Sequence, residues 1–108
     1  MSTYYDSDGI KKLRNLRKLK PDTFKAFVDF DAKAFEEGEV SVRNKELIAI
    51  AVAHITQCPY CIDAHVQRAK KAGASDTEIA EAIFVAMALR AGGSWAHGCI
   101  AMEALEKS

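Results

Sequence analysis

The apolar residues of this chain recur at three- and four-residue spacing, and nowhere do they alternate with polar residues over a sustained run. The first spacing is that of one face of an α-helix, whereas alternation would indicate a half-buried strand. The clearest helical segment follows Ser41, a favoured N-cap residue, and includes an unbroken apolar run from Leu47 to Ala53. A helix that is apolar on all sides is typical of a buried central position. The sequence therefore predicts an all-α fold built around this helix.

Prolines, glycines and capping residues divide the chain into about five to six helices. Pro59 suits the first position of a helix, where its missing N–H has no cost, so Cys58 falls at or beside the N-cap. Gly73 suits the residue after that helix, and Ser75 opens an S-x-x-E capping box for the next one. The predicted helices span about residues 8–20, 22–37, 42–56, 58–72 and 75–90, with a last helix from Ser94 after a break at Gly92 and Gly93.

Length and charge narrow the classes of function. A chain of 108 residues has the size of one domain, so we expect a single helical domain over residues 1–108. Because 15 basic and 15 acidic residues balance, there is no electrostatic reason to expect nucleic acid or an anionic membrane as partner. No uninterrupted apolar run reaches the roughly 18 residues of a membrane span, and residues 2–9 do not resemble a signal peptide. A reducing cytoplasm is therefore the expected location, where cysteines indicate metal binding, catalysis or burial.

Residues 57–65 contain the motif C-x-x-C-x-x-x-H, formed by Cys58, Cys61 and His65. At the start of a helix these three side chains share one face, because they lie three and then four residues apart. Amides at a helix N-terminus stabilise a thiolate, and a nearby imidazole can accept the thiol proton. A thiolate attacks the O–O bond of a peroxide, and the sulfenic acid that results condenses with a second thiol to a disulfide. The motif therefore favours thiol redox chemistry.

Other interpretations of the motif are weaker. Zinc could bind the three motif side chains, but its fourth ligand would have to be His54, His97 or Cys99, at spacings unlike the common zinc patterns. Haem attachment needs a histidine directly after the second cysteine, where Ile62 stands. A thioredoxin-type site needs a βαβ context, which a helical chain does not offer. The cysteines could also be small buried hydrophobic residues without chemistry.

Glu46, the apolar helix that follows it, and the motif from Cys58 to His65 together resemble the core of the carboxymuconolactone decarboxylase / alkylhydroperoxidase D superfamily. The resemblance covers about residues 20–100 and includes the separation of 12 residues between Glu46 and Cys58. It implies a helical bundle that assembles into trimers or hexamers and needs no metal, haem or flavin. The decarboxylase branch generally lacks the cysteine pair, so its presence favours the peroxidase branch.

The resemblance also implies a role for each residue. Glu46 would orient His65, His65 would be the base, and Cys58 and Cys61 would be the redox pair. Cys61, one turn from His65, is the expected attacking thiol, and Cys58 the resolving thiol. The predicted function is therefore reduction of an organic hydroperoxide or hydrogen peroxide, with an external dithiol or protein reductant restoring the thiols. The alternatives are a disulfide carrier or redox sensor without peroxidase activity, and a metal-binding structural oligomer.

The remaining candidate residues have simpler interpretations. His54, one turn before the motif, and Tyr60, between the cysteines, are placed around the site rather than in it. Cys99 is expected to be buried, and it does not face His97 two residues earlier. The aromatic stripe of the second helix and the single tryptophan are interpreted as core, or as subunit interface for the tryptophan: Phe24, Phe27, Phe35 and Trp95.

Overall fold

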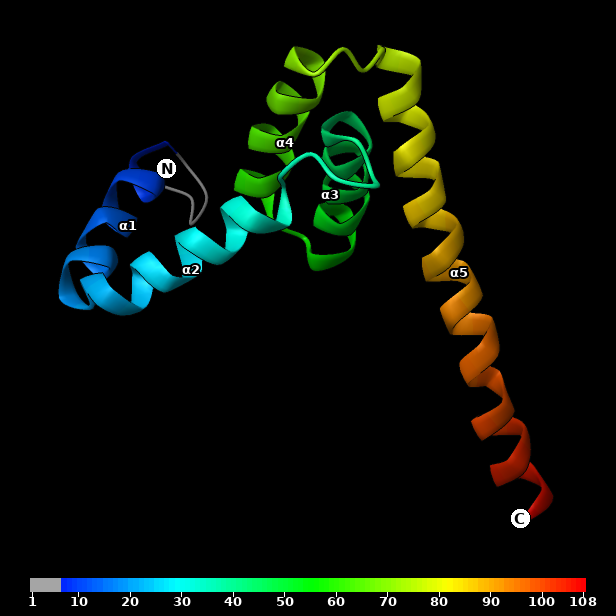
Figure 1. Cartoon of the computed structure of the whole chain (residues 1–108). Coiled ribbons are helices and arrows are strands. Elements are labelled where there is room, and N and C mark those ends of the chain that lie inside the picture. The colour runs from blue at the N-terminus through cyan, green and yellow to red at the C-terminus, as the bar shows by residue number, and fades with distance from the viewer. Residues whose placement is uncertain (1–6) are drawn as a thin grey trace.

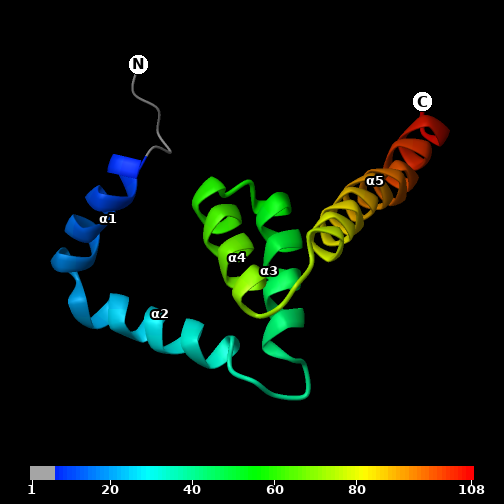
Figure 2. The same ribbon diagram turned by 90° about the horizontal axis from the view of Figure 1, so that it is seen from above.

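The computed structural model describes residues 7–108, and these form five helices and no strand, so the all-α prediction is confirmed. In chain order the helices are α1 (Ser7–Leu19), α2 (Pro21–Ala34), α3 (Val42–Thr56), α4 (Pro59–Lys71) and α5 (Asp76–Glu106). Most contacts between helices join α3 to α4 and to α5. Figures 1 and 2 show α3 and α4 side by side, with α1 and α2 as an arm on one side and α5 extending away on the other.

The centre of the fold is α3, as its apolar sequence predicts. Ser41 caps it, because the Ser41 hydroxyl oxygen accepts the Asn44 N–H at 3.1 Å. Ile50, in the middle of α3, is fully buried against Ala69 of α4 and Ala74 of the next connection. Burying a side chain of this size stabilises the fold by about 1.5–3 kcal/mol. Four partly buried residues pack around this core: Leu47, Val66, Ile79 and Ile83.

The connection between α3 and α4 is short and sharply turned. Gln57 lies in the left-handed region with φ 59°, which a residue with a side chain rarely adopts. The next amide, that of Cys58, turns back to donate to the Ala53 carbonyl at 3.2 Å. Pro59 then begins α4, and Cys58 is its N-cap, as predicted. This turn places the first cysteine at the helix N-terminus.

The connection between α4 and α5 also follows the local sequence signals. Gly73 has φ 93°, a conformation in which other residues are strained. The capping box of α5 is complete: the Ser75 hydroxyl oxygen accepts the Glu78 N–H, and the Glu78 carboxylate accepts the Ser75 N–H at 2.8 Å. The backbone hydrogen bond from Ser75 holds the pKa of Glu78 below its usual value, and the charge of Arg43, 3.2 Å away, adds to this.

The predicted break at Gly92 and Gly93 is wrong. The helix α5 runs without interruption from Asp76 to Glu106, and Ser94 lies inside it rather than at a new N-cap. Neither glycine has a positive φ. A glycine inside a helix costs about 1 kcal/mol relative to alanine, which is less than a helix loses by ending and starting again. The alanine-rich sequence on both sides therefore carries the helix through the glycines.

The predicted burial of Phe24, Phe27 and Cys99 in the core is wrong, and of the two interpretations of Trp95 the structure excludes the core of this chain but not a subunit interface. Phe27 is 59% exposed, and Phe24 contacts Phe27 and the Arg17 guanidinium of α1 instead of the central core. Trp95 is 84% exposed, and Cys99 is exposed on the same helix. These side chains are exposed for the same reason: α2 and the second half of α5 have apolar faces that no other part of residues 7–108 covers.

The chain is extended for its length. Its radius of gyration is 18.2 Å, whereas a compact domain of 108 residues has about 13 Å. Within the described residues, α5 is the one helix long and apolar enough to cross a membrane, judged by length and composition alone. A helix that packs inside a protein has the same properties, so the surroundings of α5 have to decide between these interpretations.

Candidate redox site

The centre of the site is a pair of polar side chains from neighbouring helices. Glu46 lies in the second turn of α3 and is only 3% exposed. Its Oε1 atom lies 2.6 Å from Nδ1 of His65 in α4. A buried carboxylate without a partner would be costly, and His65 supplies the partner. Because a carboxylate accepts hydrogen bonds, Nδ1 of His65 carries the proton and Nε2 keeps a free lone pair that can act as a base.

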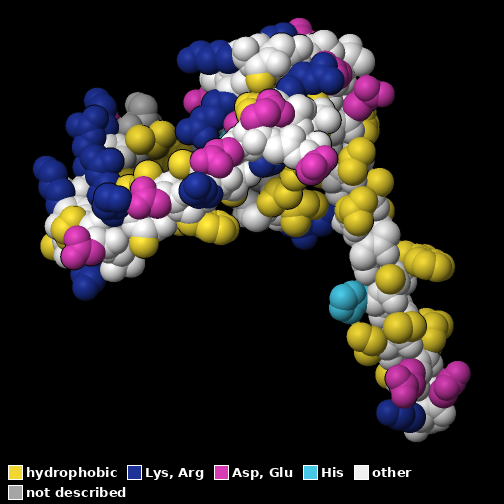
Figure 3. Space-filling model, viewed as in Figure 1, with side chains coloured by type: hydrophobic (Ala, Val, Ile, Leu, Met, Phe, Trp, Pro, Cys, Tyr) yellow, Lys and Arg dark blue, Asp and Glu magenta, His cyan; other side chains and the backbone are white. Residues whose placement is uncertain are grey.

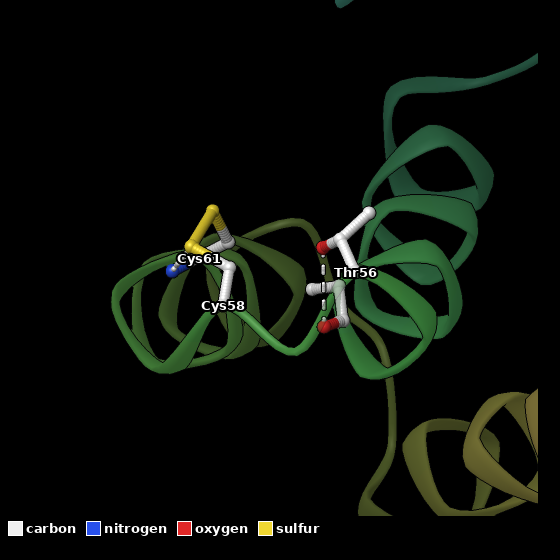
Figure 4. The surroundings of a disulfide bond; sticks show 4 residues. Thr56, Cys58 and Cys61 are labelled. Atoms are coloured by element: carbon white, nitrogen blue, oxygen red, sulfur yellow. Dashed lines mark hydrogen bonds between the residues drawn. A yellow bond between two sulfur atoms is a disulfide. The ribbon is translucent and has the colours of Figure 1, made fainter.

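The two cysteines form a disulfide at the start of α4. Their Cα atoms are 5.2 Å apart, within the usual range for a disulfide. Figure 4 shows the bond beside the end of α3, near Thr56. The sulfur of Cys58 is also the N-cap acceptor of α4, because it lies 3.2 Å from the Cys61 N–H. A thiolate at this position would receive the same hydrogen bond and the favourable field of the helix N-terminus.

A cavity of about 440 Å³ opens beside the second cysteine. Cys61 and His65 both line it, whereas Cys58 does not. The cavity lies between α3, the end of α2 and the loop that joins them, and most of its wall is apolar. The other lining residues are Ala34, Phe35, Val40, Lys45, Ile48, Ala49, Val52, Ala53 and Thr56. The space can therefore hold a small, largely apolar molecule next to the Cys61 sulfur.

Phe35 belongs to this site, although its helical spacing indicated a core residue. Its ring stacks on the His65 ring, with centroids 5.1 Å apart and planes 17° from parallel. Phe35 is the C-cap of α2, and the chain after it is fixed to α3, because the Lys45 ammonium donates to the Glu36 carbonyl. The sequence signal that could have found this residue is its position, an aromatic residue at the end of a helix just before the segment that leads to Glu46.

The two residues predicted around the site lie less close to it. His54 turns back on its own helix, where its Nδ1 donates to the Ile50 carbonyl at 2.8 Å. Tyr60 is half-buried in the first turn of α4. Neither of them lines the cavity. The geometry therefore brings together the four residues of the main prediction and adds Phe35.

Two of the three alternative zinc ligands, His97 and Cys99, lie apart from this site. His97 and Cys99 are on the exposed second half of α5, where Nδ1 of His97 lies 3.3 Å from the Gly93 carbonyl of its own helix. Across residues 7–108, no three or more histidine, cysteine, aspartate or glutamate side chains are grouped so that they could hold a metal ion.

Comparison with known proteins identifies the family. The model of the carboxymuconolactone decarboxylase family matches residues 21–104, which include every residue of the site. The chain belongs to the carboxymuconolactone decarboxylase family. This family assignment confirms the resemblance seen in the sequence, and the residues matched agree with the predicted range.

Relatives of this family member are similar in sequence and in fold. An uncharacterised protein of the cox locus of Paracoccus denitrificans is 45% identical over 82 residues, which are 76% of this chain and 74% of the relative. The crystal structure of a carboxymuconolactone decarboxylase family protein from Legionella pneumophila aligns with a TM-score of 0.71 and 33% identity, over 93% of this chain and 89% of that one.

A second solved structure carries a functional description. A family protein from Thermotoga maritima, described as a candidate participant in an antioxidative response, aligns with a TM-score of 0.58 and 29% identity. The alignment covers 75% of this chain and 93% of that protein.

Proposed function

We propose that this family member reduces peroxides through a cycle between the Cys58 and Cys61 thiols and their disulfide, with Glu46 and His65 handling the proton. The observation that supports the proposal most directly is that His65 contacts Glu46 at 2.6 Å and shares a cavity wall with Cys61. A base, a residue that orients it and a nucleophile around one space are the parts that activated-thiol catalysis needs. The description of the Thermotoga maritima protein agrees with this chemistry.

The cycle starts from the reduced thiols. His65 Nε2 takes the proton of Cys61, and the thiolate attacks one peroxide oxygen. The O–O bond breaks, the sulfur becomes a sulfenic acid, and the other oxygen leaves as an alkoxide or hydroxide that takes a proton from His65. The Cys58 thiol then attacks the sulfenic acid, which forms the disulfide and releases water. An external dithiol supplies two electrons and two protons to restore both thiols.

The cavity supports Cys61 as the attacking thiol. Cys61 lines the space in which a peroxide would lie, and Cys58 does not. Cys58 instead occupies the N-cap, where a thiolate is stabilised and leaves a disulfide readily. We propose that the external reductant therefore attacks Cys61 and displaces Cys58. A reducing cytoplasm would supply such dithiols, and we place the protein there.

Peroxide consumption by the single cysteine variants tests this proposal. With a dithiol reductant, Cys61→Ser should lose the reaction with peroxide altogether. Cys58→Ser should lose the internal disulfide step, and without the dithiol it should still react once per chain, leaving a sulfenic acid on Cys61 that dimedone labels and mass spectrometry locates. Cys99→Ser is the matched control, because this exposed thiol lies on α5 away from the cavity, and it should retain full turnover. Full turnover in both Cys58→Ser and Cys61→Ser would contradict the proposal.

One observation favours a second candidate, a disulfide carrier for another protein. A C-x-x-C pair at a helix N-terminus lowers the pKa of its first thiol in dithiol exchange proteins, and Cys58 has this position. Such a carrier would exchange its disulfide with a dithiol but consume no peroxide. The wild-type protein in the peroxide assay, run beside a disulfide-exchange assay without peroxide, separates the two functions.

A further inference from the structure

The charges of this chain balance overall but are unevenly distributed. The helix α1 carries five lysine and arginine residues against one aspartate, a net charge of +4. The rest of the neutral chain therefore has a net charge of −4. In Figure 3 the lysine and arginine side chains gather over the arm that α1 and α2 form. The neutrality of the whole chain, which gives no reason to expect an anionic partner, conceals this local basic surface.

The same helix has an exposed apolar face. Four aliphatic residues recur every three positions along α1 and are between 48% and 77% exposed: Ile10, Leu13, Leu16 and Leu19. Lys11, Arg14 and Lys18, at spacings of three and four residues, lie on the face of the helix opposite Leu13 and Leu16. A helix with one apolar and one basic face is the type that lies in the interface of a membrane, with its cations at the lipid headgroups.

The position of α1 leaves this helix accessible. Its main contact is with α2, where the Arg17 guanidinium lies 5.6 Å from the centre of the Phe24 ring. Figures 1 and 2 show α1 at one side of the molecule, apart from α3 and α5. Asp8, the single acidic residue of α1, lies 3.9 Å from Lys11 and offsets only one of the five cations. Both faces of the helix can therefore meet a large external surface.

We propose that α1 binds the surface of an anionic lipid bilayer and lies along it, with Leu13 and Leu16 toward the acyl chains. A protein in the cytoplasm, where we place this one, borders the anionic leaflet of the cell membrane. The bilayer supplies what both faces lack, since its phosphates attract the cations and its acyl chains cover the aliphatic side chains. The inference does not depend on peroxide reduction, because no residue of α1 lines the cavity beside Cys61.

Two other partners suit α1 less well. A nucleic acid would pair its phosphates with the basic row, but it would leave the aliphatic row in water. A second α1 helix would bring two groups of like charge together, each with a net charge of +4. An anionic bilayer is the partner that matches the charge and also covers the apolar face.

The long apolar helix α5 matches an anionic bilayer less well than α1 does. Its first half is fixed to α3, where Arg90 donates to the Ile55 carbonyl at 2.5 Å. The 16 residues that remain in the helix after Arg90 are about 24 Å long, shorter than the roughly 30 Å hydrocarbon core of a membrane. Residues 91–102 include no lysine or arginine to attract anionic headgroups. In α1, by contrast, basic and apolar side chains occur together.

Sedimentation of the full-length protein with lipid vesicles tests the charge of α1. At low salt the wild type should bind phosphatidylglycerol vesicles but not phosphatidylcholine vesicles, and the binding should weaken as salt is added. Lys11→Gln, Arg14→Gln and Lys18→Gln together should lower the partition coefficient about 100-fold, because each cation near an anionic surface contributes roughly 5-fold.

The matched control removes the same charges from another helix. Arg68→Gln, Lys70→Gln and Lys71→Gln together also replace two lysines and one arginine, all exposed in the last turn of α4. This control should lower the partition coefficient by less than about 5-fold, the contribution of one cation. Equal losses in the two triple variants would overturn the proposal, since net charge alone would then explain the binding. A wild type that does not bind phosphatidylglycerol vesicles would also overturn it.

A second pair of variants tests the apolar face. Leu16→Ser should lower the partition coefficient about 10-fold, because a leucine that enters the acyl region leaves water. Ile100→Ser on α5 is the control, since Ile100 is 60% exposed and Leu16 is 64% exposed, and it should leave the binding unchanged. Circular dichroism checks that each variant keeps its helix content. Loss of binding in Ile100→Ser but not in Leu16→Ser would place the membrane contact on α5 and overturn the proposal.

A fluorescent label locates the contact directly. In a background with Cys58→Ser, Cys61→Ser and Cys99→Ser, an environment-sensitive dye on Leu16→Cys should shift to shorter wavelength when phosphatidylglycerol vesicles are added. A shift that is already present without lipid and grows with protein concentration would mean that another copy covers this face, which would overturn the proposal. A shift with duplex DNA but not with vesicles would overturn it as well, because a nucleic acid would then be the partner.

Discussion

The pair of helices α3 and α4 and residues 91–106 of α5, which we call the α5 tail and which extend free of the other helices in Figures 1 and 3, are opposite cases within one chain. In the first, each unusual residue has its partner nearby: buried Glu46 contacts His65, and Cys58 caps the helix that contains Cys61. In the tail, the unusual residues have no such partner, since nothing approaches the space beside Gly92 and Trp95 is exposed. One copy of the chain therefore explains the site, whereas no other part of residues 7–108 covers the exposed apolar side chains of the tail.

After the cysteines, the largest effect should come from the base of the site. His65→Gln keeps a polar side chain but cannot take a proton, so the rate of peroxide reduction near pH 7 should fall by about 10²–10⁴-fold. The rate should recover in part as the pH rises, because the thiol then ionises without help. A pH–rate profile measures both effects.

The same measurement tests whether the α3–α4 pair works within one copy of the chain. If the α3–α4 pair is self-sufficient, the loss of rate in His65→Gln should not depend on the protein concentration. A loss that depends on concentration would show that a second copy completes the site. A flat pH profile of the variant would show that His65 is not the base.

A matched pair of isoleucines compares the two regions by stability. Ile50→Ala removes a fully buried side chain of α3 and should cost about 2–5 kcal/mol of unfolding free energy. Ile100→Ala, on the tail, should change the unfolding free energy of the dilute monomer by less than about 0.5 kcal/mol, because the side chain is 60% exposed. Urea titrations of both variants at low concentration give these values. A large cost for Ile100→Ala in the monomer would mean that the tail folds back on its own chain.

Phe35 should have a smaller effect that is confined to the site. A stacked aromatic pair contributes about 0.5–1.5 kcal/mol, so Phe35→Leu should lower the rate of peroxide reduction about 2- to 12-fold by loosening the orientation of His65. The pH–rate profile should also shift, because His65 becomes more hydrated. Phe35→Tyr, which keeps the ring, should restore both.

Phe30→Leu is the control for this substitution. Phe30 lies in the same helix and is 71% exposed, so its loss should leave the rate and the pH profile unchanged. If Phe35→Leu lowers stability without moving the pH profile, Phe35 packs against His65 without positioning it.

The parts of the fold that the sequence predicts are those whose signals act over a few residues. Ser41, Gly73 and the capping box at Ser75 each satisfy backbone groups within one turn, and the structure confirms all three. The length of α5 is harder to predict. Glycine locally favours the end of a helix, whereas the cooperativity of a long helix favours its continuation. Local signals therefore predict where a helix begins more reliably than they predict whether a glycine inside a helix ends it.

The site depends on contacts that no local pattern contains. From its own position, Glu46 is an acidic residue near a helix start, which favourable dipole interactions alone explain. Its contact with His65 joins residues 19 positions apart, and in the sequence only the family resemblance predicts this contact. Phe35 was assigned to the core because helical spacing says which residues share a face but not what that face meets. Packing between helices decides both cases.

The smallest effect concerns the N-terminus of α5. The groups that cap this end of the helix, Ser75 and Glu78, belong to the same chain. Because the Ser75 backbone N–H holds the pKa of Glu78 below its usual value of 4.5, the ionised carboxylate stabilises the folded state. This contribution is complete above about pH 4.5 and is lost as the pH falls through the lower folded-state pKa. Between pH 5 and pH 3 the wild type should therefore lose more stability than Glu78→Gln, whose side chain does not titrate. Chemical unfolding at a series of pH values measures the difference, with the exposed Glu81→Gln in the same helix as the control. If the unfolding free energies of the wild type and Glu78→Gln fell in parallel with pH, the charge of Glu78 would not stabilise the start of α5.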